Sequence, residues 1–178
     1  MKQIVWLGIS IAAAVSLGPW LLGSDAAQNQ NAVAPAAAIS AIGAISGELI
    51  YVPVYSRIYY EDGKSTLELA ATLSIHNVNP EQSITVSRAD YYNTAGTLIH
   101  QYVTAPLVLR PLETKHLIIE KANTAGGVGA NFLVAWNSEQ AVSPPLVEAL
   151  MVNASHNLGI AFTSAGRVIQ RSGTPVTK

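Results

Sequence analysis

Three glycines close together in the sequence raise the question of a phosphate-binding loop. The stretch NTAGGVGANF, residues 123–132, places Gly126, Gly127 and Gly129 between two apolar runs. A phosphate loop needs a helix after the glycines, so that N–H groups at the helix N-terminus face the phosphate. The residues that follow, ANFLVAWNS, alternate like a strand instead. We therefore predict a strand-to-strand turn in which the glycines supply positive φ angles, and we expect no bound cofactor.

Histidines, acids and nucleophiles do not form a recognisable catalytic or metal-binding motif. The four histidines lie too far apart for an HxH, HxxxH or HExxH ligand pair. They are His76, His100, His116 and His156. The chain has no cysteine, no GxSxG elbow and no SxxK motif. Acids such as Glu61, Asp62 and Glu113 fall in apparent turns, where solvation explains them. We predict no catalytic residue and no metal site, although histidines distant in sequence could converge in the fold.

The clearest candidate for a binding surface is the first strand-like stretch, residues 49–60. Alternation places its aliphatic side chains on one face and its tyrosines and arginine on the other. This second group is Tyr51, Tyr55, Arg57 and Tyr59. Tyr and Arg are enriched at interfaces, so we predict an interaction surface. The alternative is that a second sheet, a loop or an N-terminal linker covers these rings. Pro53 predicts an edge strand or a bulge, because proline cannot donate a ladder hydrogen bond.

Composition and charge set wider limits on the chain. It has 178 residues, of which 49% are hydrophobic and 12% charged, and its formal net charge is −1. This is enough sequence for one core of ordinary domain size. The lysines and arginines are scattered along the chain, so nucleic acid is not an expected partner.

The two ends of the chain differ from its middle. Residues 1–26 carry the positively charged Lys2 near their start, continue with an apolar run and end in small residues, which predicts a signal peptide. The run is also long enough for an uncleaved membrane anchor, and a buried core helix is the third alternative. We predict a flexible alanine-rich linker over residues 27–46, the folded domain over 47–170 and a polar tail over 171–178. The domain would then be exported, to the periplasm or the outer face of the cytoplasmic membrane, and would touch the membrane only through an uncleaved N-terminus.

Alternation with a period of two runs through the middle of the chain. It is firmest in residues 67–76, where every odd position is hydrophobic. A slip of phase after Val86 predicts a bulge near Ser87. About eight or nine short strands, without amphipathic helical stretches between them, predict an all-β fold. We expect an antiparallel β-sandwich of immunoglobulin-like topology, preceded by the signal or anchor helix and the linker, with a barrel as the second choice.

Five blocks of the sequence, in this order, resemble a known family. They are YVPVYSRIYY, TLSIHN, DYYNTAG, GGVGANFLVAW and GIAFTSAGRVI. Together they span roughly residues 47–169 and are similar to the bacterial domain-of-unknown-function family 3124. The resemblance implies a secreted or envelope-associated protein. It implies no activity, because that family has no assigned catalytic residues to transfer to this chain.

These observations favour an exported, non-catalytic envelope protein that acts as a protein-interaction or structural module, with another envelope protein as its partner. The alternative is a periplasmic protein that binds a small ligand or a metal, which converging histidines would favour. A hydrolytic enzyme is the third hypothesis, and a deep polar cleft with paired acids would favour it.

Overall fold

The computed structural model describes residues 46–154 and 159–172. The predicted signal segment, almost all of the linker, His156 and the last residues of the tail lie outside this part of the chain. Within the described residues, no helix is long and apolar enough to cross a membrane. The described chain is all-β, as the alternation predicts, and consists of twelve strands and one short 3₁₀ helix.

The larger sheet is antiparallel and has the order β12-β1-β9-β5-β6, with β7 paired to the beginning of β5. Its strands are β1 (Ser46–Val54), β5 (Ile84–Tyr92), β6 (Leu98–Gln101), β7 (Leu107–Leu109), β9 (Ala130–Ser138) and β12 (Arg167–Arg171). Strand β9 pairs with β1 on one side and β5 on the other, so it lies in the middle of the sheet.

The second sheet is also antiparallel and has the order β11-β10-β4-β8. Its strands are β4 (Ala70–His76), β8 (Thr114–Ile119), β10 (Leu146–Asn153) and β11 (Ile160–Ala165). Strands β2 (Arg57–Tyr60) and β3 (Ser65–Glu68) form a separate two-stranded sheet. The 3₁₀ helix η1 (Thr124–Gly129) directly precedes β9.

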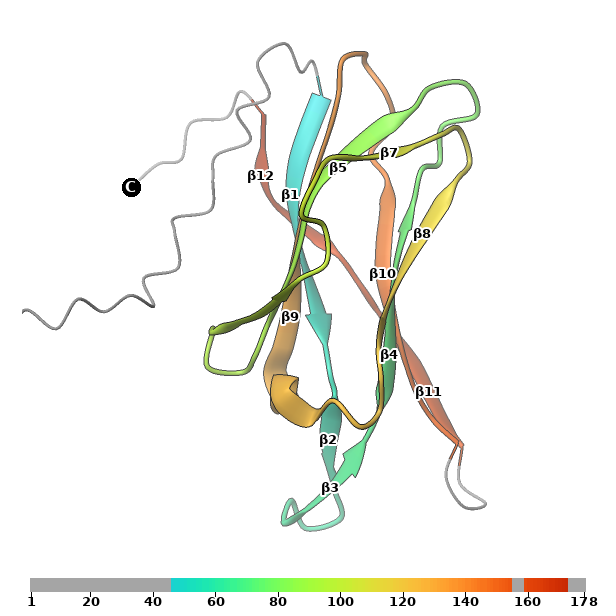
Figure 1. The fold of residues 1–178 in the computed structure, drawn as a ribbon. Coiled ribbons are helices and arrows are strands. Elements are labelled where there is room, and N and C mark those ends of the chain that lie inside the picture. The colour runs from blue at the N-terminus through green and yellow to red at the C-terminus, as the bar shows by residue number, and fades with distance from the viewer. Residues whose placement is uncertain (1–45, 155–158, 173–178) are drawn as a thin grey trace, which may run out of the picture. The chain divides into compact units, whose positions relative to one another are not determined.

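The two larger sheets lie face to face, as in a β-sandwich, and their inner faces form the hydrophobic core (Figure 1). In β4 the side chains of Ala71, Leu73 and Ile75 are buried, whereas the residues between them are partly accessible. Such alternation is what a strand with one buried face requires. The period-two pattern in the sequence therefore marks the core face correctly.

The structure has twelve strands where eight or nine were expected, and two of the additional strands arise because two predicted strands are each divided. The stretch 49–60 divides at Tyr55 and Ser56 into β1 of the larger sheet and β2 of the hairpin. The stretch 67–76 divides at Leu69 into β3 and β4. The Leu69 N–H donates to the Ser56 carbonyl at 2.9 Å, so both divisions lie at the base of the hairpin. The chain changes sheets there without interrupting its alternation.

Two local predictions for the larger sheet are confirmed. The pairing of β5 with β9 shifts between Val86 and Arg88, which is the bulge expected near Ser87. Strand β12 pairs with β1 only as far as Tyr51, so Pro53 lies beyond that ladder at a local edge. The missing N–H of Pro53 therefore costs no ladder hydrogen bond.

Candidate functional site

The β2–β3 hairpin lies at one end of the two facing sheets (Figure 1). Strand β2 pairs with β3 along its whole length. In the turn, Glu61 and Gly63 have positive φ angles of 54° and 77°, and Asp62 Oδ1 accepts the N–H of Lys64 at 3.0 Å. A two-stranded ribbon is marginally stable by itself. Its attachment to the sandwich therefore decides whether it keeps its shape.

Polar and apolar contacts attach the hairpin to the rest of the domain. Arg57 Nη2 donates to the Thr124 carbonyl of η1 at 2.8 Å, and Ser56 Oγ donates to the Gly127 carbonyl at 3.1 Å. Ile58 follows Ser56 and Arg57 toward the tip of the hairpin and packs against the core. The Arg57 guanidinium thus holds the hairpin against η1.

Tyr59 and Tyr60 carry the exposed aromatic surface of the hairpin. Their exposed fractions are 61% and 44%. Alternation predicts Tyr59 but not Tyr60 for this surface, because a strand with one buried face places neighbouring side chains on opposite sides. Beyond Ile58 both faces of the ribbon reach solvent, so both rings are accessible. The signal in the sequence was a pair of tyrosines directly before a turn.

The other predicted surface tyrosines lie elsewhere. Tyr51 is half-buried in β1, where β9 and β12 pair on either side of it. Tyr55 lies at the division between β1 and β2, packs against the core, and has its ring centroid 6.1 Å from that of Phe162 in β11. The predicted face is therefore divided. Tyr55 matches the alternative that another element covers the rings, and the hairpin carries the exposed part.

The glycine segment forms η1, and only one of its glycines has a positive φ. Gly127 has φ 78° and ψ −155°, whereas Gly126 and Gly129 do not have positive φ angles, so the expectation for these two is wrong. Gly126 is needed for space instead, because its Cβ would lie 1.9 Å from the Tyr91 hydroxyl; a Cβ on Gly129 would lie 3.3 Å from Thr94 Cγ2, which is tight but requires only a small shift. As predicted, a strand follows the glycines.

Two of the four histidines converge in the fold. The ring centroids of His76 in β4 and His116 in β8 are 6.5 Å apart. Thr114 Oγ1 lies 2.9 Å from His76 Nδ1, and Ser74 Oγ lies 3.0 Å from His116 Nδ1. His100 lies apart from them on β6. Among the residues that the structure describes, no three His, Cys, Asp or Glu side chains form a group that could hold a metal ion.

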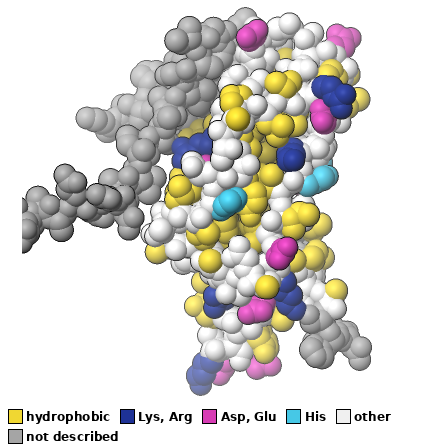
Figure 2. Space-filling model, viewed as in Figure 1, with side chains coloured by type: hydrophobic (Ala, Val, Ile, Leu, Met, Phe, Trp, Pro, Cys, Tyr) yellow, Lys and Arg dark blue, Asp and Glu magenta, His cyan; other side chains and the backbone are white. Residues whose placement is uncertain are grey.

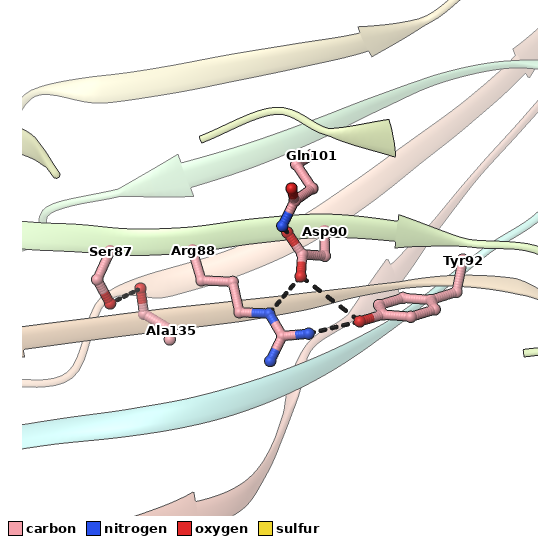
Figure 3. A network of polar contacts seen from close by, with 6 residues as sticks. All are labelled: Ser87, Arg88, Asp90, Tyr92, Gln101 and Ala135. Atoms are coloured by element: carbon pink, nitrogen blue, oxygen red, sulfur yellow. Dashed lines mark hydrogen bonds and ion pairs between the residues drawn. The ribbon is translucent and has the colours of Figure 1, made fainter. Parts of the chain in front are cut away.

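A polar network occupies the face of β5 opposite the core (Figure 3). Arg88 Nε lies 2.5 Å from Asp90 Oδ2, and Arg88 Nη2 lies 2.5 Å from the Tyr92 hydroxyl oxygen. Gln101 Nε2 reaches from β6 and donates to Asp90 Oδ1 at 3.4 Å. Asp90 is only 2% exposed. The carboxylate and guanidinium engage each other, and through Gln101 the network links β5 to β6.

A second buried carboxylate lines a pocket of about 220 Å³ where β1 begins and β12 ends. Glu48 is 5% exposed. Its Oε1 accepts from Arg171 Nε at 3.0 Å and its Oε2 from Trp136 Nε1 at 3.4 Å. The carboxylate therefore links β12, β1 and β9. No motif in the sequence indicated this role, because it depends on strands that lie far apart along the chain.

Burial raises the pKa of three tyrosine hydroxyls above their usual value of 10.0, those of Tyr91, Tyr92 and Tyr102. For Tyr92, the nearby Arg88 guanidinium lowers the pKa and the Asp90 carboxylate raises it, but burial has the largest effect. In each case the folded state favours the neutral phenol, because burial penalises the phenolate.

We expect the protein to lose stability as the pH rises above about 10. Below that value the three phenols are neutral in both states, and their stabilising contribution is fully present. Above it the unfolded chain loses the protons first, so the contribution disappears as the pH approaches the raised pKa values of the folded state.

Urea unfolding at pH 8 and pH 11 measures this loss of stability. The variant Tyr91→Phe should lose less stability between the two pH values, while Tyr59→Phe, which alters an exposed ring, should behave like the parent. Equal losses in Tyr91→Phe and the parent would contradict the assignment.

Comparison with known proteins places the chain in a family. The family described as protein of unknown function (DUF3124) matches residues 47–169, which confirms the resemblance of the five sequence blocks. Searches of curated proteins and of solved structures found no match. The matched residues include β2–β3, η1, the histidine pair and the Arg88 network. Because the match covers more than half of the length of the chain, the chain belongs to the DUF3124 family.

Proposed function

We propose that the chain is an exported, non-catalytic protein-interaction module of the cell envelope, and that the β2–β3 hairpin is its recognition surface. The observation that carries this proposal is the exposure of Tyr59 and Tyr60 next to each other on an anchored hairpin. Tyrosine offers a large amphipathic contact area with only two side-chain torsions to fix. Because Arg57 already holds the hairpin against η1, binding requires little further ordering.

The charges near the rings favour a protein partner. The hairpin turn carries Glu61, Asp62 and Lys64, and Lys64 Nζ lies 3.3 Å from Asp62 Oδ2. On the face seen in Figure 2, charged side chains of both signs are likewise scattered. A phosphate backbone would need a concentrated basic surface. Aromatic contact and shape are therefore the proposed basis of recognition, with another envelope protein as the partner.

The use of the buried acids supports a non-catalytic role. The two buried acidic residues in the described part of the chain, Glu48 and Asp90, form ion pairs with Arg171 and Arg88. We further propose that the two facing sheets are an immunoglobulin-like sandwich. Such domains commonly bind through loops at one end of the sandwich, and the hairpin lies at one end of the two sheets (Figure 1). We propose that residues 1–26 direct export and that residues 27–46 connect the domain to the membrane if the first segment is not cleaved.

Capture of a partner from envelope extracts tests the proposal. Tyr59→Ala should reduce partner retention roughly tenfold, about 1.4 kcal/mol of binding free energy, because it truncates an exposed aromatic anchor. Its melting temperature should stay close to that of the parent, since exposed positions contribute little to stability. Val108→Ala, which truncates an apolar residue 58% exposed on β7, is the matched control and should keep the partner. Retention that is equal in both variants would refute the hairpin as the surface, and recovery of the chain from the cytoplasm would refute export.

Binding of a small ligand is a second candidate function, favoured by the pocket beside Glu48. Its volume of about 220 Å³ would hold only a small molecule. A ligand with an amine or guanidinium group would compete with Arg171, whose side chain is 68% exposed, for the Glu48 carboxylate.

A further inference from the structure

We propose that His76 and His116 form a two-histidine site for a divalent transition-metal ion such as Cu²⁺, Ni²⁺ or Zn²⁺. This goes beyond the interaction function, because the histidines lie on β4 and β8 and the hairpin on β2 and β3. The sequence separates the two histidines widely, and only the pairing of β4 with β8 brings their rings together.

The strand register places both rings on one face of the second sheet. Ser74 pairs with His116, and His76 pairs with Thr114, so the histidines are diagonal neighbours. Leu73, like the other core residues of β4, points into the sandwich. The face with the histidines is therefore the outer one; an ion from solution can reach the exposed His116 directly, whereas the buried Nε2 of His76 must first be uncovered.

A hydroxyl group contacts Nδ1 of each ring, and the contact at His76 prepares that ring for metal binding. Thr114 Oγ1 lies at His76 Nδ1 and Ser74 Oγ at His116 Nδ1, at 2.9 and 3.0 Å. A hydrogen bond at one ring nitrogen fixes the orientation of the ring and leaves the other nitrogen as the ligand. His76 Nε2 is buried and has no hydrogen-bond partner in the structure. Such an atom would gain an interaction by binding a metal ion.

The distance between the rings suits one shared ion after a small movement. With nitrogen–metal distances of about 2.0–2.1 Å, two imidazoles on a tetrahedral ion place their ring centroids about 5 Å apart. The observed separation is 6.5 Å. His116 is exposed, so its side chain can rotate to close the difference, and this movement gives up its contact with Ser74. Imidazole favours Cu²⁺, Ni²⁺ and Zn²⁺ over Mg²⁺ and Ca²⁺.

The remaining coordination positions would be filled by water, because no third histidine or acid completes a ligand group among the described residues. Glu148 of β10 pairs with Ser74 and contributes a carboxylate to the same face of the sheet. Its negative charge would favour a cation there without direct coordination. The site is therefore expected to bind reversibly, with copper bound most tightly.

Titration calorimetry on the full chain, purified without a polyhistidine tag, tests this site with CuCl₂, NiCl₂, ZnCl₂ and MgCl₂. We expect one transition-metal ion per chain, the tightest binding for Cu²⁺ and no binding of Mg²⁺. His76→Ala and His116→Ala should each weaken Cu²⁺ binding at least tenfold, because one imidazole cannot replace two. His100→Ala, which removes an exposed histidine on β6, should leave the affinity unchanged.

Circular dichroism and melting of every variant show that a loss of binding is not a loss of fold. His116→Gln provides a second, polar replacement at the exposed position and should weaken binding as His116→Ala does. Unchanged Cu²⁺ affinity in both His116 variants would overturn the proposal. So would an equal loss in His100→Ala, or the absence of binding to the parent protein.

Discussion

Replacing Asp90 with alanine is expected to lower the free energy of unfolding by about 3 kcal/mol, because it leaves a mostly buried guanidinium without its carboxylate partner. The side chains of Arg88 and Asp90 are 18% and 3% exposed, and Arg88 Nε lies 2.5 Å from Asp90 Oδ2. The same substitution also removes the acceptor for Gln101 Nε2. Urea unfolding at constant pH measures the difference from the parent protein.

The matched control removes both charges at once. Breaking a buried ion pair is costly, whereas replacing both partners with apolar residues of similar size is often neutral. The double variant Arg88→Met/Asp90→Leu should therefore be more stable than Asp90→Ala, although it carries one more substitution. If the single variant were as stable as the double one, Arg88 would have to reach water when Asp90 is absent. The network would then contribute little to stability.

Local alternation predicts the strands well, because it records which side of each residue faces the core. Residues 67–76 give β4 its buried Leu73 and Ile75, and a phase slip gives the bulge between Val86 and Arg88. Pro53 marks a local edge, since a missing N–H is tolerated only outside the ladder. These features are determined by neighbouring residues, so they can be read from a single sequence.

Changes of sheet cannot be predicted in the same way. The residues around Tyr55 and Ser56 keep their alternation while the chain leaves the larger sheet. What fixes the division is tertiary: Ser56 bonds to Gly127 through its hydroxyl and to Leu69 through its carbonyl. The sequence therefore predicts one strand over residues 49–60 and does not single out the exposed Tyr60.

The candidate sites depend on strand register in the same manner. His76 and His116 become neighbours only because β4 and β8 pair with one particular alignment. The predicted signal segment and linker lie outside the described residues, so their assignments remain predictions. The glycines of η1 show most clearly what a single sequence cannot predict. Composition predicts a turn there, but Gly126 is required because the Tyr91 side chain on β5 leaves no room for a Cβ.

Replacing Gly126 with alanine is the second substitution expected to have a large effect, at about 3 kcal/mol of lost stability. The new Cβ would lie 1.9 Å from the Tyr91 hydroxyl oxygen and 2.8 Å from both Tyr91 Cζ and Ala130 Cβ. Tyr91 is fully buried, with its ring centroid 5.0 Å from that of Phe132, so it cannot move aside. Close-packed interiors accommodate an added methyl group only by shifting backbone or leaving good rotamers.

The loop cannot easily retreat either. The Gly126 carbonyl accepts both the N–H and the hydroxyl of Thr94, at 2.9 and 3.0 Å. Moving η1 away from Tyr91 would break these bonds and pull on Arg57, which holds the hairpin through the Thr124 carbonyl. A displaced η1 is thus expected to loosen the hairpin as well as the core.

Two comparisons separate this collision from a general effect of replacing glycine. Gly159→Ala places its Cβ more than 4 Å from the other atoms that the structure describes and should change stability little. In the double variant Gly126→Ala/Tyr91→Phe the closest atom is gone, so part of the lost stability should return, although the 2.8 Å contacts with ring Cζ and with Ala130 Cβ remain. The midpoints of urea unfolding for the four proteins give the result. If Gly126→Ala proved as stable as Gly159→Ala, the packing of η1 on Tyr91 would be wrong. Recovery of stability in the double variant would locate the strain at the Tyr91 hydroxyl. Gly126 would then be required for its small size and not for its backbone conformation.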